Sequence, residues 1–181
     1  EMCIRDRCNL SKTFGISYEG NDVPLSLYDA MVENVPLKDI IRSTDISTLD
    51  FVPESPELTL LDRMLMGEFQ RETILGNILE SVKGDYQAII IDCPPQWNEL
   101  VTNSLMVADA IVSPISADGE SYHSFKMFIP ELTKFITKSK KSFKAIKFIP
   151  NNVDVRNKYT TSFQKKYLDQ YPELFTSTFI R

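Results

Sequence analysis

The stretch that decides the fold is Tyr86-Gln-Ala-Ile-Ile-Ile-Asp92-Cys-Pro-Pro95. Its apolar run, residues 88–91, does not alternate with polar residues and ends at Asp92. Such a run is typical of a strand buried on both faces of a parallel sheet. Two prolines then turn the chain out of the sheet, because proline fixes φ and has no N–H to donate. The stretch therefore predicts a parallel strand that carries a carboxylate at its carboxyl end.

Helical and strand patterns alternate on both sides of this strand. Apolar spacing predicts helices over residues 25–35, 37–42, 100–107, 122–136 and 159–168, one or two helices over 58–82, and strands over 49–52, 88–92, 110–115, 145–149 and 174–180. We expect Pro130 to kink or restart its helix and Pro114 to stop its strand. The order predicts an α/β fold with a doubly wound, mostly parallel sheet flanked by helices. The chain has no internal repeat or linker, which favours one domain.

Composition excludes several classes of protein. The 181 residues are 43% hydrophobic and 25% charged, with a net charge of −5, so a surface basic all over is excluded but a local basic patch is not. No apolar run reaches the roughly 18–20 residues of a membrane span. Three cysteines and one histidine, without C-x-x-C, argue against a disulfide framework and common zinc sites and favour a cytosolic setting. The six glycines form neither G-x-x-x-x-G-K-[ST] nor G-x-G-x-x-G.

The first seven residues, Glu-Met-Cys-Ile-Arg-Asp-Arg, show no periodicity. We interpret residues 1–7 as a non-native cloning or sequencing remnant and leave them out of the fold prediction. The alternative is a native N-terminal strand, which the many charged residues make less favourable. Residues 8–181 are then expected to form the domain.

Asp92 is the first candidate site residue. Open α/β sheets bind ligands at the carboxyl ends of their strands. A carboxylate there can hold Mg²⁺, usually through water, while the ion bridges terminal phosphates. The alternative is that Asp92 caps a turn or a helix.

With the residues that follow, this stretch resembles the ParA/Soj/MinD family of deviant P-loop ATPases, and within it the partition branch. YQAIIIDCPPQWNELVTNSLMVADAIVSPISADGESYHSF, residues 86–125, is similar to the Walker B and switch II region of that family. The matching positions are Asp92, Pro94, Pro95, Asn103, Ala108, Asp109 and Pro114. CNLSKTFGI, residues 8–16, is similar to the end of the family's second phosphate-side motif, and FIPNNVDVRNKY, residues 148–159, resembles its base-side loop.

The resemblance implies ATP and Mg²⁺ as cofactors. It implies that Asp92 holds Mg²⁺ through water and that the Ser11 hydroxyl senses the γ-phosphate. Four further residues are implied in nucleotide binding or in relaying switch movement: Asn151, Asn152, Pro94 and Asn103. The alternatives are a loop serine for Ser11, a solvated helix position for Asn103, and turn conformations for the asparagines.

Lysines cluster in the otherwise acidic chain, at positions 134, 138, 140, 141, 144 and 147. Partition ATPases of this family bind DNA non-specifically through basic surface residues of their ATP-bound dimer. The resemblance therefore implies DNA contacts by Lys138, Lys140, Lys141 and Arg156, and such contacts to phosphates weaken with salt. The alternatives are a solvated helix end, where cations favour the helix dipole, and for Arg156 a surface ion pair.

The implied function is ATP-dependent partition of plasmid or chromosomal DNA in the bacterial cytoplasm, in association with the nucleoid. The implied partners are DNA, a ParB-like centromere-binding protein and a second copy in an ATP-dependent homodimer, with no membrane contact. A MinD-like membrane-cycling ATPase and a non-catalytic DNA-binding or scaffold protein are the alternatives.

The chain also departs from the family pattern. The first strand and P-loop of the family would precede residue 8, and its D-x-D-P-Q core would lie where residues 1–7 stand. We therefore expect a fragment, truncated at both ends, of such an ATPase. Without P-loop donors it is expected to be inactive alone.

Overall fold

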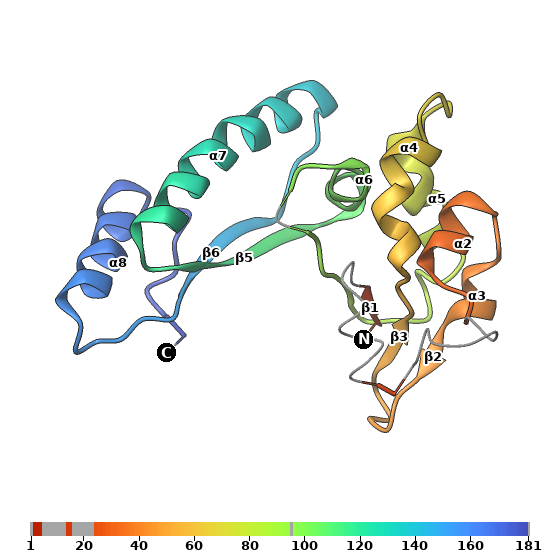
Figure 1. Cartoon of the computed structure of the whole chain (residues 1–181), viewed down its shortest axis with the longest axis horizontal. Helices are drawn as coiled ribbons and strands as arrows, with labels where there is room; N and C mark the ends of the chain where they lie inside the picture. The colour runs from red at the N-terminus through yellow and green to blue at the C-terminus, as the bar shows by residue number, and fades with distance from the viewer. Residues whose placement is uncertain (1, 5–13, 16–23, 95, 181) are drawn as a thin grey trace. The chain divides into compact units, whose positions relative to one another are not determined.

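The computed structural model describes residues 2–4, 14–15, 24–94 and 96–180. The chain divides into two compact units, Glu1–Val107 (unit 1) and Ala108–Arg181 (unit 2), and each is described by itself. In each unit helices accompany a sheet that contains parallel strands (Figure 1), so the α/β class is confirmed. The expectation of one domain over residues 8–181 stays a prediction.

Unit 1 contains a four-stranded sheet with the order β2-β3-β1-β4. β1 (Met2–Ile4) lies between β3 (Asp50–Val52) and β4 (Ile89–Ile91) and is parallel to both, whereas β2 (Arg42–Ser43) is antiparallel to β3. Leaving residues 1–7 out of the fold was therefore wrong. The strand uses only the uncharged residues Met2-Cys3-Ile4, so the charges that argued against it lie outside it. The origin of residues 1–7 as a remnant stays a prediction.

The burial of β4 also differs from the prediction. Residues 88–92 were expected to be buried on both faces, but Ile90 is 51% exposed. β4 is the outer strand of the described sheet and has a neighbouring strand only on the β1 side, so less of it is covered. Ile91 is level with Ile4 of β1, which is level with Val52 of β3. The carboxyl ends of the three parallel strands therefore lie at one edge.

Short helices supply the core of unit 1. They are α2 (Leu27–Val32), α3 (Leu37–Ile40), the 3-10 helix η1 (Pro56–Leu60), α4 (Leu61–Met64), the 3-10 helix η2 (Arg71–Thr73), α5 (Ile74–Leu79) and α6 (Glu99–Val107). Residues 58–82, predicted to form one or two helices, are divided between α4 and η2. Gly67 and Gln70 have φ values of 95° and 53° there, which an α-helix does not accommodate. The buried residues include Leu27, Ile40, Leu61, Leu75 and Leu100.

Unit 2 has a parallel pair of strands, β5 (Ala110–Ser116) and β6 (Ala145–Asn151), with helices α7 (Gly119–Ser139) and α8 (Lys158–Gln170). β5 does not stop at Pro114 as predicted. It has a neighbouring strand on one side only, and an edge strand accommodates a proline, whose missing N–H then costs no ladder bond. α7 likewise continues through Pro130 as one helix instead of restarting there.

The strand predicted over residues 174–180 is present only as an isolated bridge. Phe148 of β6 donates its N–H to the Leu174 carbonyl at 2.8 Å and accepts from the Thr176 N–H at 3.0 Å. Phe148 and Phe175 form a parallel bridge. This segment therefore follows β6 without becoming a regular strand.

Aromatic rings form the core of unit 2. Phe125 of α7 meets Phe148 edge to face at 4.9 Å between ring centroids, and Phe148 stacks on Phe175 at 5.4 Å. Tyr167 of α8 stacks on Phe175 at 4.6 Å. Aromatic pairs in such geometries stabilise a core beyond the area that they bury, so these rings join α7, α8 and the C-terminal segment to β6.

We predict that Phe148→Ala lowers the free energy of unfolding by about 3–5 kcal/mol, because it removes a buried ring and leaves a cavity. Urea denaturation followed by circular dichroism measures this change. Val112→Ala on β5 is the control, since Val112 is 63% exposed, and should change the stability by less than about 0.5 kcal/mol. Equal effects of the two substitutions would contradict the placement of Phe148 in the core.

Candidate functional site

Asp92 occupies the predicted position. It is the first residue after β4, at the carboxyl edge of the sheet, and it is only half-buried. A carboxylate oxygen is the type of ligand that Mg²⁺ prefers, directly or through water. Pro94 is half-buried in the loop that follows, and Pro95 lies outside the described residues. The position and partial exposure of Asp92 therefore fit a magnesium ligand.

A second polar group lies at the same edge, after β3. Glu54 and Ser55 follow this strand and are both buried. Within the described part of the chain, Ser55 Oγ is the one buried side-chain oxygen or nitrogen that has no hydrogen-bond partner. A buried hydroxyl without a partner is costly unless a ligand or a water binds it. Sequence analysis missed Ser55, because no pattern distinguishes it from an ordinary loop serine.

The N-terminus of α6, which follows the Asp92 loop, is already capped. Asp62 Oδ1 accepts a hydrogen bond from the Glu99 N–H at 2.7 Å, and Asn98 Oδ1 accepts one from the Val101 N–H at 2.9 Å. These carboxylate and amide oxygens satisfy donors that could otherwise bind an anion. The start of α6 therefore does not supply a phosphate site.

Asn103 lies in the core of unit 1 and is 0% exposed. Its Oδ1 accepts from the Leu75 N–H at 3.0 Å, and its Nδ2 donates to the carbonyls of Arg71 and Glu99, each at 2.9 Å. The alternative of a solvated helix position is wrong. The implied direct contact with a cofactor does not fit either, because the side chain is buried and its polar atoms are occupied. A part in relaying movement stays a prediction.

Ser11 lies outside the described residues. The nearest described residue after it, Phe14, packs against Phe51 of β3 with 4.9 Å between the ring centroids. The role implied for the Ser11 hydroxyl stays a prediction.

In unit 2 the two predicted asparagines lie where β6 ends. Asn151 is the last residue of β6, and its carbonyl accepts from the Ala117 N–H at 3.2 Å. Asn152 has a φ of 55°, and its Nδ2 donates to Ser116 Oγ at 3.4 Å. Asparagine tolerates this left-handed conformation well. The geometry thus accounts for Asn152 as a turn residue, while nucleotide contact by either residue stays a prediction.

Tyr167, which bonds to the end of β5, keeps its hydroxyl proton. The Tyr167 hydroxyl donates to the Ser116 carbonyl at 3.1 Å. Burial, and then the nearby Asp118 carboxylate, raise the pKa of Tyr167 above its usual value. Tyr167 therefore remains a hydrogen-bond donor that positions the end of β5.

Arg156 forms a local ion pair. Its Nε lies 3.1 Å from Asp154 Oδ1, and its backbone N–H also donates to that oxygen at 3.0 Å. The guanidinium and then the backbone N–H hold the pKa of Asp154 below its usual value. The surface ion pair expected as an alternative is thus present, whereas DNA contact by Arg156 stays a prediction.

Three lysines of the cluster have defined ionic or hydrogen-bond partners. Lys134 pairs with Glu131 at 3.6 Å, Lys144 pairs with Asp109 at 3.2 Å, and Lys147 Nζ donates to the Glu173 carbonyl at 2.8 Å. Lys138 lies in the last turn of α7, Lys140 is its C-cap residue and Lys141 follows. Cations at the C-terminal end of a helix interact favourably with the helix dipole. This agrees with the alternative of a solvated helix end for these lysines.

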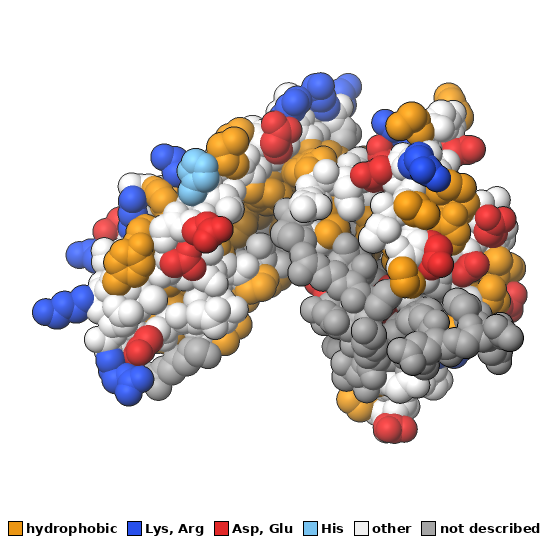
Figure 2. All heavy atoms as spheres, viewed as in Figure 1, with side chains coloured by type: hydrophobic (Ala, Val, Ile, Leu, Met, Phe, Trp, Pro, Cys, Tyr) orange, Lys and Arg blue, Asp and Glu red, His pale blue; other side chains and the backbone are white. Residues whose placement is uncertain are grey.

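Charge is divided unequally between the two units. Residues 108–181 contain twelve Lys and Arg but seven Asp and Glu, a net charge of +5, whereas residues 1–107 have a net charge of −10. Figure 2 shows the basic side chains of unit 2 over the end of α7 and along α8. A basic surface therefore exists in this acidic chain.

In residues 2–4, 14–15, 24–94 and 96–180, no helix is long and apolar enough to cross a membrane, and no group of three or more His, Cys, Asp or Glu is placed to hold a metal ion. In these ranges, a site for Mg²⁺ at Asp92 would need ligands from water or phosphate.

We predict that Asn103→Ala lowers the free energy of unfolding by about 1–3 kcal/mol, because it leaves the Leu75 N–H buried and unpaired. Asn103→Asp keeps the acceptor and loses the donors, so it separates the two contributions. Thr102→Ala is the control, since its hydroxyl bonds only to the Asn98 carbonyl one turn away. The measurement is thermal unfolding. An unchanged midpoint for Asn103→Ala would contradict a stabilising role for these hydrogen bonds.

The chain matches the family described as AAA domain (AAA_31) over residues 6–146. It is 28% identical over 166 residues to the cell division protein PomZ of Myxococcus xanthus, covering 92% of this chain and 52% of that protein. It is 36% identical over 106 residues to the sporulation initiation inhibitor protein Soj of Bacillus subtilis, covering 59% of this chain and 42% of Soj. The chain thus spans about half the length of these relatives or less.

The fold is also that of solved P-loop ATPases. The structure resembles cobyrinic acid a,c-diamide synthase from Mycobacterium smegmatis with bound ADP and magnesium, with a TM-score of 0.83 at 20% identity over 94% of this chain and 68% of that one. At this identity the likeness concerns the fold alone. The family match covers most of the chain and includes the strand that ends at Asp92. The chain therefore belongs to the AAA domain family of ParA/Soj/MinD-type P-loop ATPases.

Proposed function

We propose that the chain is part of an ATPase that partitions plasmid or chromosomal DNA. The observation that carries the proposal is Asp92 at the carboxyl end of β4, half-buried, in a chain of the ParA/Soj/MinD type. The unpaired Ser55 hydroxyl at the same sheet edge supports a polar ligand there. The relatives carry names that refer to cell division, sporulation and chromosome partition, which supports this reading over a small-molecule synthase.

In this proposal ATP and Mg²⁺ are the cofactors, and Mg²⁺ supplies charge neutralisation at the terminal phosphates. Asp92, at the carboxyl end of β4, would hold the ion through its water shell. The further roles implied by the family would be sensing of the γ-phosphate by Ser11, contact with the base by Asn151 and Asn152, and shaping of the switch loop by Pro94. The phosphate cradle would come from residues of the whole protein other than the described ones. The 181 residues by themselves are therefore proposed to be inactive.

The proposal gives unit 2 the DNA-binding role. Its net charge of +5 attracts phosphates, and Lys138, Lys140 and Lys141 lie together at one helix end. Arg156 contributes less, because Asp154 already neutralises it. ATP would favour a homodimer of the whole protein, and a ParB-like centromere-binding partner would stimulate hydrolysis. This cycle would take place in the bacterial cytoplasm, at the nucleoid.

A non-catalytic DNA-binding or scaffold protein remains the second candidate, because the chain has no G-x-x-x-x-G-K-[ST] sequence. A lysine-bearing P-loop encoded upstream in the source gene supports the ATPase, whereas a gene that starts at this segment supports the scaffold.

We predict that Asp92→Asn weakens Mg²⁺-dependent ATP binding by about 10–100-fold in the chain extended by the upstream residues of its gene. The physical reason is the loss of the charge that orients the hydrated ion. Calorimetric titration with ATP, with and without Mg²⁺, measures the effect.

Asp85→Asn is the matched control, because it removes an equal charge from an exposed pair with Lys38. Equal Mg²⁺-dependent affinities for the Asp92→Asn and unsubstituted proteins would remove Asp92 from this role.

We predict that the triple substitution of Lys138, Lys140 and Lys141 by alanine weakens binding to duplex DNA of any sequence. Each lost phosphate contact should make the slope of log K against log[salt] shallower by about 1. Fluorescence anisotropy of a labelled duplex over a NaCl series measures both quantities.

The triple alanine substitution of Lys134, Lys144 and Lys147 is the control, because it removes the same charge from three other lysines of the cluster, which pair with Glu131, Asp109 and the Glu173 carbonyl. The DNA assignment is wrong if the two triple variants lose affinity and slope equally.

A further inference from the structure

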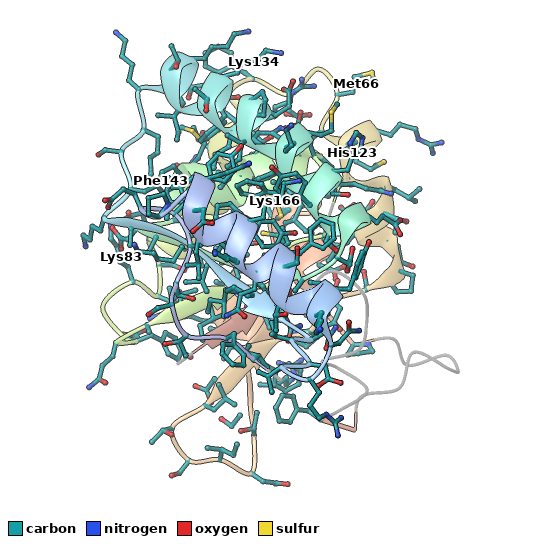
Figure 3. All side chains as sticks on the ribbon, turned by 90° about the vertical axis from the view of Figure 1, so that its left-hand side faces the viewer. Met66, Lys83, His123, Lys134, Phe143 and Lys166 are labelled. Carbon is teal, nitrogen blue, oxygen red and sulfur yellow. The ribbon has the colours of Figure 1, made fainter. Side chains whose placement is uncertain are left out.

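Unit 1 exposes a group of apolar side chains that the proposed site does not use. We call Leu60, Met64, Met66 and Phe69 the apolar patch; their exposed fractions are 42%, 40%, 71% and 87%. All four lie within ten consecutive residues, on η1, α4 and the turn that follows. Figure 3 shows Met66 projecting from the ribbon. Exposed apolar side chains grouped in this way mark an interaction surface more often than single ones do.

The core of unit 1 does not explain the apolar patch. Leu61 and Leu65 are buried and lie four residues apart, so they already give α4 its core-facing side. Leu60 and Met64 repeat the same spacing on the exposed side. Gly67, with a φ of 95°, makes the turn, so the exposed aromatic ring of Phe69 is not needed for it. The patch thus leaves apolar surface in water without a local structural reason.

The charges around the apolar patch are mainly acidic. Exposed or half-buried carboxylates are interleaved with it in sequence, at Glu57, Asp62, Glu68 and Glu72. This stretch contains two arginines. Arg71 pairs with Glu99 at 3.1 Å, and Arg63 has no ion pair with a described residue. Unit 1 as a whole has a net charge of −10. An occupant that is both apolar and positively charged therefore complements this surface.

We propose that the apolar patch is a docking surface for an amphipathic, lysine- or arginine-rich peptide segment of a partner protein. Methionines adapt their shape to an apolar side chain, and Phe69 supplies the aromatic anchor typical of binding hot spots. The surrounding carboxylates pair with the cations of the segment. The same carboxylates repel DNA and anionic lipid surfaces, so neither is the occupant.

The surface is also held in place before binding. Asp62, between Leu60 and Met64, accepts from the Glu99 N–H at 2.7 Å, and Arg71 binds the Glu99 carboxylate at 3.1 Å. The segment that carries the patch is thus held to the first residue of α6 at two points, one inside the patch at Asp62 and one just after it at Arg71. A pre-organised surface loses less entropy when a partner binds.

The test uses the 181-residue chain without nucleotide, so its result is independent of the proposed ATPase. The probe is a fluorescent 18-residue peptide of leucine and lysine with leucines at helical spacing, and the control peptide has glutamate in place of lysine. We expect the lysine peptide to bind, and Met66→Ser/Phe69→Ser to weaken binding by at least about tenfold. Glu68→Gln/Glu72→Gln should weaken it less and reduce its salt dependence.

Ile46→Ser/Val112→Ser is the matched control, since both side chains are exposed and apolar, at 55% and 63%, and lie outside the patch. Circular dichroism checks that each variant keeps its fold. The proposal is overturned if both double serine variants bind the lysine peptide equally, or if the glutamate peptide binds as tightly. It is also overturned if Met66→Ser/Phe69→Ser instead abolishes self-association of the chain, measured by ultracentrifugation, or its sedimentation with phosphatidylserine vesicles.

Discussion

The parallel pairing of β1 with β3 and β4 is the constraint on which the candidate site in unit 1 depends. It places Val52, Ile4 and Ile91 in one row, so that the residues after them emerge at one edge. Asp92 follows one of these strands, and the buried residues Glu54 and Ser55 follow another. A one-residue slip in the pairing would turn these side chains to the other face. The register therefore decides whether a carboxylate and an unpaired hydroxyl can serve one ligand.

A second set of contacts connects this edge to the rest of unit 1 through α6. Glu99 lies seven residues after Asp92. Its N–H donates to the Asp62 carboxylate, its own carboxylate pairs with Arg71, and its carbonyl accepts from Asn103 Nδ2. Asn103 then reaches the start of α5 through the Leu75 N–H. A movement of the Asp92 loop would have to move α6 against these bonds or carry α4 and η2 with it. When a switch changes between two arrangements, side-chain networks of this kind can contribute to the difference in their energies.

The sequence predicted the strand that ends at Asp92 and most helices, because their apolar spacing is local information. It failed where neighbours decide the outcome. β1 was missed because the charges beside it outweighed three uncharged residues, although its place between two strands stabilises it. The burial of Asn103 was missed because an asparagine in a helix carries no sign of the backbone groups that it will meet. Ser55 was missed for the same reason: whether a hydroxyl is left unpaired depends on every group around it.

The unequal charge of the two units gives the basic and acidic surfaces different tasks. A chain with a net charge of −5 would repel DNA if its charges were spread evenly. With +5 on residues 108–181 and −10 on residues 1–107, the basic unit can attract phosphates while the acidic unit can attract cationic protein segments. Screening shortens the reach of each field to about 8–10 Å in physiological salt, so the two attractions need not cancel. A chain with its charge divided in this way can therefore bind a polyanion through one unit and a polycation through the other.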